Sequence, residues 1–465
     1  MVNKEKIKPN ILFLLVDSLR ADKVYGDQRS SKTPNLDKMI KDGTYFTQAI
    51  SPSDATLLSF RSIFTGLFPF KTGSLENKRS FEKIDNDLPT LPKILKNSGY
   101  KIIGKVPSFS FLESLYSEFD DDDKFSVEKK WPRLDDGIGE EIIKKLKTNL
   151  EPPWFYFVHL LDVHSKIRPG MAPLVIPEKF DSEQFGESKY ERAVSATDDW
   201  LGKILENVNL DETLVIITAD HGSFIPHYQK DVKVSFEETI TPNIPNIKTP
   251  KFLNSLKRKV YSKIVNNREK SLRDKIEKVS LTEYEKRNLF CMEDKNPFKV
   301  LYDDMVKVPL LFLGKNIPQG KIIKEQVSIR SILSTLIEFL QINENINTDG
   351  HSLWPIIKGK KIEEEPIFIQ SSFPLETKLG YMVGIRTSKY KYNRLIDDPK
   401  QNVFLYNLEN DPKEENNIAN IHPDVIDEFE KILKKYHNKV KNEKEQVNES
   451  ENKIIEDELK KLGYI

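Results

Sequence analysis

Four runs made up mainly of apolar residues constrain the fold of this chain more than any other feature. They occupy residues 10–16, 154–161, 213–219 and 308–313, and the first of them reads NILFLLV. A strand of a parallel sheet whose two faces are both covered is apolar along its whole length. A strand with one solvent-exposed face alternates apolar and polar residues instead. The four runs therefore predict buried strands of one sheet.

Segments with helical spacing lie between these runs, for example residues 35–42, 88–97 and 190–206. Alternating strands and helices are typical of an α/β protein whose sheet carries helices on both faces. We therefore expect a large mixed, mostly parallel sheet between helix layers. The chain has 465 residues, which is long enough for more than one structural unit.

Two regions depart from the alternation and set the expected domain boundaries. Residues 228–297 read as a helical and basic insertion, because their part 251–278 carries ten Lys/Arg against three Asp/Glu. Near the C-terminus, short strand-like segments precede one more helix. We expect a large domain over residues 1–375, a small antiparallel sheet plus helix over 376–437, and a charged tail over 438–465.

Composition narrows the class of protein. Lys+Arg and Asp+Glu number 72 each, so the overall charge gives no reason to expect a nucleic-acid partner. No segment approaches the ~20 apolar residues of a membrane helix, and the first residues lack the apolar core of a secretion signal. The single cysteine, Cys291, cannot form a disulfide within the chain. We expect a cytoplasmic protein, in which segment 251–278 is a solvated helix or, alternatively, a lid or a peripheral membrane contact.

Polar side chains follow three of the predicted strands at the point where each strand ends. Asp17 follows the first run, Asp162 and His164 follow the second, and Asp220 and His221 follow the third. Ligands of open α/β sheets bind outside the carboxyl ends of the strands, so these groups can converge. A single Asp after a strand is most often a turn or cap residue. Three such strand ends, one of them Asp-His-Gly, favour a functional site instead.

The segment DATLLSFRSIFTG, residues 54–66, adds a hydroxyl where a helix is predicted to begin. Thr56 reads as a helix N-cap, as a nucleophile, or as both. With Asp17, Asp220 and His221 it makes a mainly oxygen donor set that suits a divalent cation such as Ca²⁺, Mn²⁺, Zn²⁺ or Mg²⁺. A cation would favour the Thr56 alkoxide, and the N–H groups of the helix would face an anionic ester group.

The order of these motifs resembles the sulfatase branch of the alkaline phosphatase superfamily. NILFLLVDSLRAD, the segment 56–66 that ends in Thr-Gly, HLLDVHS and TLVIITADHGS follow the order of the family, and LYDDMVKVPLLFLG and LYNLENDPKEENN continue it. The resemblance covers most of residues 10–437. It implies an alkaline-phosphatase-like sandwich with a small C-terminal α+β subdomain, and a metal-dependent hydrolase that cleaves phosphate or sulfate esters.

Two departures from the family pattern bear on the chemistry. Typical sulfatases carry, at the position of Thr56, a cysteine that is oxidised to formylglycine, so no formylglycine is expected here. Ser18 stands where many sulfatases have a second Asp, which leaves Asp17, Asp220 and His221 as the expected metal ligands with Thr56 as the fourth. Because a threonine nucleophile is more usual in relatives that act on phosphate esters, we expect a phosphoester somewhat ahead of a sulfate ester. Transfer of a phospho-headgroup to a glycan or lipid, and a non-catalytic binding protein with a degenerate site, stay open.

The resemblance also implies residues that contact the anionic substrate. His164 would bind the ester oxygens or protonate the leaving group. Arg61 lies one position beyond the family's Arg, so on a helix it is turned ~100° away, which favours a surface or supporting role. The remaining candidates for substrate binding are Lys105, His227 and Lys299.

Overall fold

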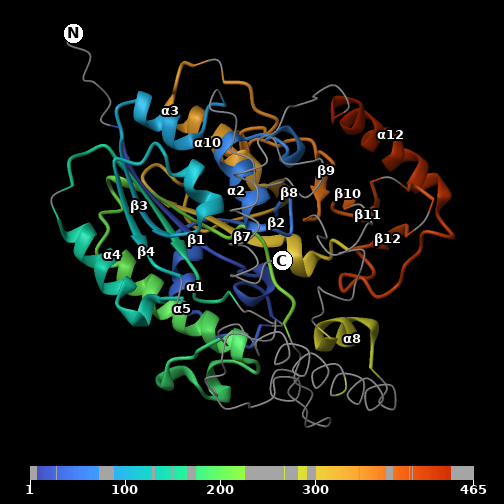
Figure 1. Ribbon diagram of the computed structural model, residues 1–465, viewed down its shortest axis with the longest axis horizontal. Helices are drawn as coiled ribbons and strands as arrows, with labels where there is room; N and C mark the ends of the chain where they lie inside the picture. Colours follow the sequence, from blue (N-terminus) through green and yellow to red (C-terminus); the bar gives the residue numbers. More distant parts are fainter. Residues whose placement is uncertain are drawn as a thin grey trace, which may run out of the picture.

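The computed structural model shows a large sheet between helix layers and a smaller sheet beside it (Figure 1). The large sheet has eight strands in the order β4-β3-β5-β1-β6-β7-β2-β8. The residues that the structure describes are 8–27, 29–72, 88–127, 131–148, 150–164, 174–225, 267, 281–290, 300–344, 346–372, 381–396, 398–400 and 402–440.

The large sheet is mixed and mostly parallel, as the sequence predicts. Strand β7 runs antiparallel to both of its neighbours, and every other pairing is parallel. The strands are β1 (Asn10–Val16), β2 (Gly43–Ile50), β3 (Lys101–Pro107), β4 (Asp121–Phe125), β5 (Trp154–Leu160), β6 (Thr213–Thr218), β7 (Lys307–Gly314) and β8 (Lys321–Ser328).

The four apolar runs became β1, β5, β6 and β7, and their central residues are buried. The run at 308–313 is buried as expected but pairs antiparallel, because burial on both faces follows from the helix layers and not from strand direction. Helices α2, α3 and α10 cover one face of the sheet and α1, α4 and α5 the other (Figure 1). Their bounds are α1 (Pro34–Lys41), α2 (Thr56–Thr65), α3 (Leu91–Asn97), α4 (Ile138–Lys147), α5 (Lys189–Leu205) and α10 (Ile332–Leu340).

The small sheet is antiparallel, with the order β12-β11-β10-β9, and one long helix packs on it. Its first strand begins at Ile367, ahead of the boundary expected at residue 376. The bounds are β9 (Ile367–Gln370), β10 (Met382–Arg386), β11 (Tyr390–Leu395), β12 (Phe404–Asn407) and α12 (Pro423–Val440). Shorter helices are α8 (Glu283–Phe290), α9 (Asp303–Val306) and α11 (Trp354–Ile357).

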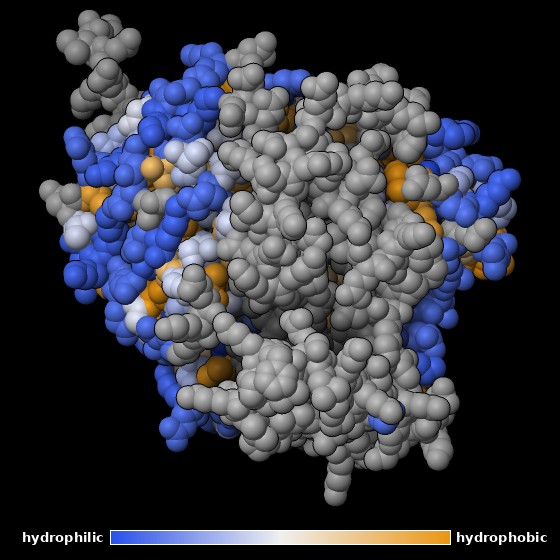
Figure 2. All heavy atoms as spheres, in the orientation of Figure 1, coloured by the Kyte–Doolittle hydropathy of each residue, from blue (hydrophilic) through white to orange (hydrophobic). Residues whose placement is uncertain are grey.

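Much of the expected insertion 228–297 lies outside the described residues, as does nearly all of the basic segment 251–278. Within the part of the chain that is described, no helix has the length and apolar character needed to cross a bilayer. On the face shown in Figure 2, the coloured residues are mainly hydrophilic, with scattered apolar side chains. The basic segment's role as a lid or membrane contact stays a prediction.

Aromatic rings that meet edge to face attach α2 to the sheet. Phe60 and Phe64 lie on one side of α2, and their ring centroids are 5.8 and 5.2 Å from that of Phe157 on β5. Phe157 also meets Phe13 of β1 edge to face at 5.3 Å, and all four rings are fully buried. Edge-to-face pairs contribute energy beyond the burial of their area. This packing fixes where the N-terminus of α2 lies relative to the ends of β1 and β5.

We expect Phe157→Ala to lower the free energy of unfolding by about 3–5 kcal/mol, because it leaves a cavity beneath α2 that the neighbouring rings cannot fill. Ile421→Ala is the matched control, since Ile421 is 69% exposed and its truncation removes little burial. Urea unfolding of both variants measures the difference. A Phe157→Ala variant as stable as the control would contradict the packing described here.

Candidate active site

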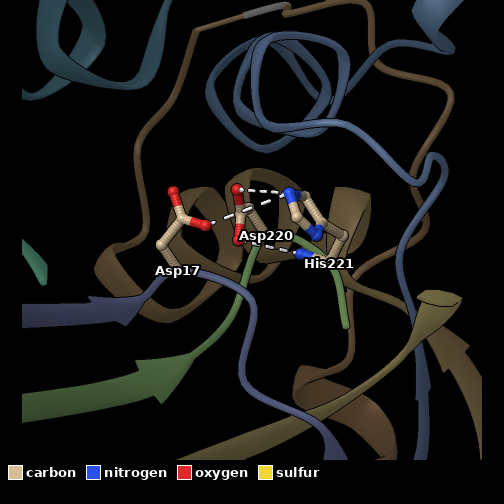
Figure 3. Close-up of side chains that lie close together, drawn as sticks. All are labelled: Asp17, Asp220 and His221. Atoms are coloured by element: carbon tan, nitrogen blue, oxygen red, sulfur yellow. Dashed lines mark hydrogen bonds and ion pairs between the residues drawn. The ribbon is translucent and has the colours of Figure 1, made fainter. Parts of the chain in front are cut away.

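Strand register brings two carboxylates together at the carboxyl ends of β1 and β6. Leu15 of β1 pairs with Thr218 of β6, and Asp17 and Asp220 each lie two residues beyond that pair. His221 follows directly, and one donor atom from each of the three residues lies within 4.8 Å of the other two (Figure 3). All three are buried. The sequence predicts this convergence, and the parallel pairing of β1 with β6 produces it.

Thr56 completes the cluster from the helix layer. It is the first residue of α2, while Ala55 is the N-cap, so the N-cap interpretation of Thr56 does not hold. Its Oγ1 lies 3.2 Å from His221 Nε2. The hydroxyl thus faces the cluster instead of capping its own helix, and the first N–H groups of α2 point the same way.

The hydrogen bonds around Asp220 and His221 leave one donor atom of each for a ligand. Asp220 Oδ1 accepts from two backbone N–H groups, those of Ser18 at 3.1 Å and His221 at 2.9 Å. Asp220 Oδ2 is buried and has no hydrogen-bond partner among the residues that the structure describes. His221 Nδ1 donates to the Gly222 carbonyl at 2.7 Å, so Nε2 is the ring nitrogen that faces the cluster, and its lone pair can bind a cation once Nε2 has lost its proton.

The residues present fit a divalent cation. His221 Nε2 lies 3.5 Å from Asp220 Oδ2 and 3.9 Å from Asp17 Oδ1, beside the Thr56 hydroxyl. Donors that sit about 2.1 Å from one tetrahedral ion are about 3.4 Å apart. The separations are therefore those of a common ligand shell, and the unpaired Asp220 oxygen is a buried acceptor that such an ion would satisfy.

Electrostatics give the same indication. Burial raises the pKa of Asp17, but His164, His159 and His221 outweigh it and hold that pKa far below its usual range. Burial and the Asp17 charge raise the pKa of Asp220. Burial lowers the pKa of His221, yet the Asp220 and Asp17 carboxylates raise it to about 9. The buried carboxylates thus make the electrostatic potential negative at the place where the donor atoms meet, which favours a bound cation there.

Ser18 adopts a left-handed backbone conformation directly after β1, with φ of 64°. Its hydroxyl donates to Asp17 Oδ1 at 2.8 Å, and its carbonyl accepts from the Tyr190 hydroxyl at 2.6 Å. A positive φ is unfavourable for serine and persists where surrounding contacts enforce it. Where the resembled family often places a second ligand, this chain therefore has a residue that supports Asp17 and Asp220.

His164 lies at the edge of the cluster, as predicted. Its Nε2 is 3.7 Å from Asp17 Oδ1, and its ring lies against Trp131 with centroids 4.9 Å apart. Asp162, two residues earlier, accepts from the Leu134 N–H at 3.0 Å. Burial raises the pKa of Asp162 to about 7. Of the two residues after β5, only His164 contacts the cluster.

Of the other substrate-binding candidates, the structure describes Lys105 and Arg61, and both have their charged groups paired away from this cluster. The Lys105 ammonium is buried and contacts Asp123 Oδ2 at 2.6 Å and Glu141 Oε2 at 2.5 Å. Arg61 is not at the surface: its side chain is fully buried, and Nη1 donates to the Thr72 carbonyl at 3.3 Å. His227 and Lys299 lie outside the described residues, so their roles stay predictions.

Two residues near the site escaped the sequence analysis. His159, on β5, is fully buried and its Nε2 lies 3.0 Å from Asp17 Oδ2. Arg20 is buried as well; it donates to the Ser223 carbonyl at 3.3 Å and pairs with Asp304 at 2.5 Å. In the sequence, His159 is visible as a histidine inside an apolar strand and Arg20 as an arginine three residues after Asp17. The partners of both residues can be identified only once the order of the strands is known.

Comparison with known proteins agrees with this arrangement. The family described as Sulfatase matches residues 9–342, and the family described as N-sulphoglucosamine sulphohydrolase, C-terminal, matches residues 294–446. Arylsulfatase K of Xenopus laevis is 22% identical, covering 86% of this chain and 77% of its own. N-acetylglucosamine-6-O-sulfatase of Bacteroides thetaiotaomicron is 22% identical, covering 96% and 89%.

Solved structures share the fold. The phosphonate monoester hydrolase of Agrobacterium radiobacter superposes with a TM-score of 0.64 at 16% identity, covering 93% of this chain and 96% of its own. A 2-O GAG sulfatase superposes with a TM-score of 0.62 at 19% identity, covering 95% of each chain. The family match over most of the chain, with the cluster at the strand ends, confirms the resemblance: the chain belongs to the sulfatase family of ester hydrolases.

Proposed function

We propose that this protein is a metal-dependent hydrolase of an anionic ester, with Thr56 as the nucleophile. One observation carries the proposal: the Thr56 hydroxyl, at the first position of α2, lies 3.2 Å from His221 Nε2 in the buried Asp/Asp/His cluster. A nucleophilic hydroxyl needs a neighbouring group that favours its ionised form. The Asp/Asp/His cluster is suited to hold a cation that would have this effect.

Asp17, Asp220, His221 and Thr56 would hold the divalent cation. When bound, such a cation supplies positive charge that favours an ionised hydroxyl and offsets charge on the ester oxygens. The chain adds further stabilisation of its own. The N-terminus of α2 presents backbone N–H groups and the positive end of its dipole to an anion beside Thr56.

His164 is the candidate for the leaving-group side. Its Nε2 lies 3.7 Å from Asp17 Oδ1, so the carboxylate is close enough to orient the ring. An imidazole at that place can bind an ester oxygen or protonate the departing one. Attack by Thr56 on phosphorus would give a phosphothreonine, which water then hydrolyses.

We favour a phosphate ester over a sulfate ester. Threonine cannot form the geminal diol from which formylglycine enzymes of this family release sulfate by elimination, so the covalent intermediate has to be resolved by a second attack. A phosphothreonine can be resolved in this way, by attack of water on phosphorus. The fold shared with a phosphonate monoester hydrolase is compatible with a phosphoester substrate. A sulfate ester is the second candidate, because the relatives named above are sulfatases. Transfer to an acceptor other than water would use the same residues.

The first test is substrate turnover. We expect wild-type protein with added divalent metal to cleave p-nitrophenyl phosphate or bis-p-nitrophenyl phosphate faster than p-nitrophenyl sulfate. Thr56→Ala should lower kcat at least ~10³-fold, because the nucleophile is lost. Thr56→Ser is the matched control, since it keeps the hydroxyl.

Two outcomes would oppose the proposal. Cleavage of the sulfate alone would show that the sulfatase alternative is correct. Retained activity in Thr56→Ala would show that the attacking group is not Thr56, whatever the ester.

The second test is metal identity. We expect Mn²⁺ or Zn²⁺ to remain bound after dialysis in preference to Ca²⁺, since an imidazole and four protein donors suit these ions, whereas Ca²⁺ takes six to eight oxygens. Metal analysis by mass spectrometry gives the ratio of metal to protein, and Asp220→Asn should lower it. Stoichiometric Ca²⁺ would contradict the expected selectivity. Protein without any retained metal would favour the non-catalytic alternative.

A further inference from the structure

We propose that His159 is a positioning residue that makes Asp17 a one-oxygen ligand of the cation. The inference rests on the proposed function, and it concerns a residue with no role in the reaction described above. His159 lies on β5, and Asp17 follows the neighbouring strand β1. Leu15 pairs with His159 in that register, so the imidazole reaches the carboxylate from the adjacent strand.

The geometry assigns the two oxygens of Asp17 to different partners. Oδ2 lies 3.0 Å from His159 Nε2. Oδ1 faces the cluster, 3.9 Å from His221 Nε2 and 3.7 Å from His164 Nε2. It also accepts from the Ser18 hydroxyl at 2.8 Å, which leaves one of its lone pairs for the ion. An ionised carboxylate only accepts hydrogen bonds, so His159 Nε2 carries the hydrogen and donates it. With Oδ2 held in this way, only Oδ1 is directed at the ion.

Packing alone does not account for a histidine at this place. His159 is fully buried, and its ring lies 4.7 Å from that of Phe60 and 6.4 Å from that of Phe109. Within the described part of the chain, its Nδ1 has no hydrogen-bond partner. A buried unpaired nitrogen is unfavourable, and a phenylalanine would fill the same apolar space without it. What the imidazole adds is the hydrogen bond to Asp17.

Holding Asp17 by one oxygen affects both affinity and selectivity. A hydrogen bond to a ligating carboxylate orients it before the ion arrives, and losing such a partner typically costs 10–100-fold in metal affinity. It also prevents Asp17 from binding through both oxygens, a mode that Ca²⁺ accepts readily. The hydrogen bond from His159 to Asp17 therefore favours a cation with few ligands over Ca²⁺.

The test measures metal binding directly, without activity. Dialysed full-length protein is titrated with Mn²⁺ and with Ca²⁺ by calorimetry, for wild type, His159→Phe and His159→Gln. We expect His159→Phe to bind Mn²⁺ 10–100-fold more weakly than wild type while losing less of its Ca²⁺ affinity. His159→Gln places an amide N–H near the position of Nε2 and should recover most of the Mn²⁺ affinity.

A control separates positioning from packing. Phe109→Leu disturbs the apolar surroundings of the His159 ring and leaves the hydrogen bond to Asp17 in place. We expect it to lower the melting temperature of the metal-free protein with little change in Mn²⁺ affinity. His159→Phe removes a hydrogen bond from a buried carboxylate, so it should also lower the metal-free melting temperature, but unlike Phe109→Leu it should weaken Mn²⁺ binding.

Three results would overturn the proposal. Equal Mn²⁺ affinity in His159→Phe and wild type would show that the hydrogen bond does not position Asp17. Failure of His159→Gln to recover any of the affinity lost in His159→Phe would show that an N–H donor at this place does not orient Asp17. Wild-type protein that binds neither ion would instead refute the metal dependence of the proposed function, and this inference with it.

Discussion

The parallel pairing of β1 with β6 is the constraint on which the rest of the site depends. It places Asp17 and Asp220 beside each other at the carboxyl ends of the two strands, each two residues beyond the pair Leu15 and Thr218. Both carboxylates are fully buried. Two buried carboxylates repel each other, so the arrangement is stable only if positive charge is nearby. His221, His159 and a bound cation are the sources of positive charge or hydrogen bonding that the geometry offers.

Thr56 reaches this environment because α2 is held at two ends. Beyond its N-terminus, Ser53 forms an isolated bridge with Gln370, and the Gln370 N–H donates to the Pro52 carbonyl at 2.9 Å. Along the helix, Phe60 and Phe64 pack on Phe157. The small sheet thus contacts the segment that carries the hydroxyl. The two sheets together, and not the large one alone, determine where Thr56 lies.

The sequence predicted those parts of the structure that depend on local pattern. Runs made up mainly of apolar residues predict buried strands, and the polar residues that follow them predicted Asp17, Asp220 and His221 as one cluster. Strand order and direction come from long-range packing, so the antiparallel β7 could not be read from its apolar run. His159 escaped for the same reason: a histidine in a buried strand has no evident partner until β5 is placed beside β1.

A resemblance to a family places the charge of a long cationic side chain less exactly than that of a carboxylate directly after a strand. Lys105 is predicted to bind substrate, and its ammonium pairs with Asp123 and Glu141, so its role in binding stays a prediction. Long side chains can turn toward several partners, so the position of a backbone does not fix the position of its charge. Aspartate and histidine side chains directly after a strand are short, so their polar atoms stay near the edge of the sheet. Short side chains are therefore better predicted from sequence than long ones.

Buried charges extend from the site into the small subdomain. Arg20, three residues after Asp17, pairs with Asp304 at 2.5 Å, and Arg287 of α8 approaches the other oxygen of Asp304 at 3.2 Å. The neighbouring Asp303 contacts Arg386 of β10 and Lys391 of β11, both at 2.8 Å. Removing one partner of a buried pair costs far more than the pair contributes, because a charge is then left uncompensated. The loop after β1 is therefore coupled to the small sheet through the adjacent carboxylates Asp303 and Asp304, whose charges are compensated by cations from both parts of the chain.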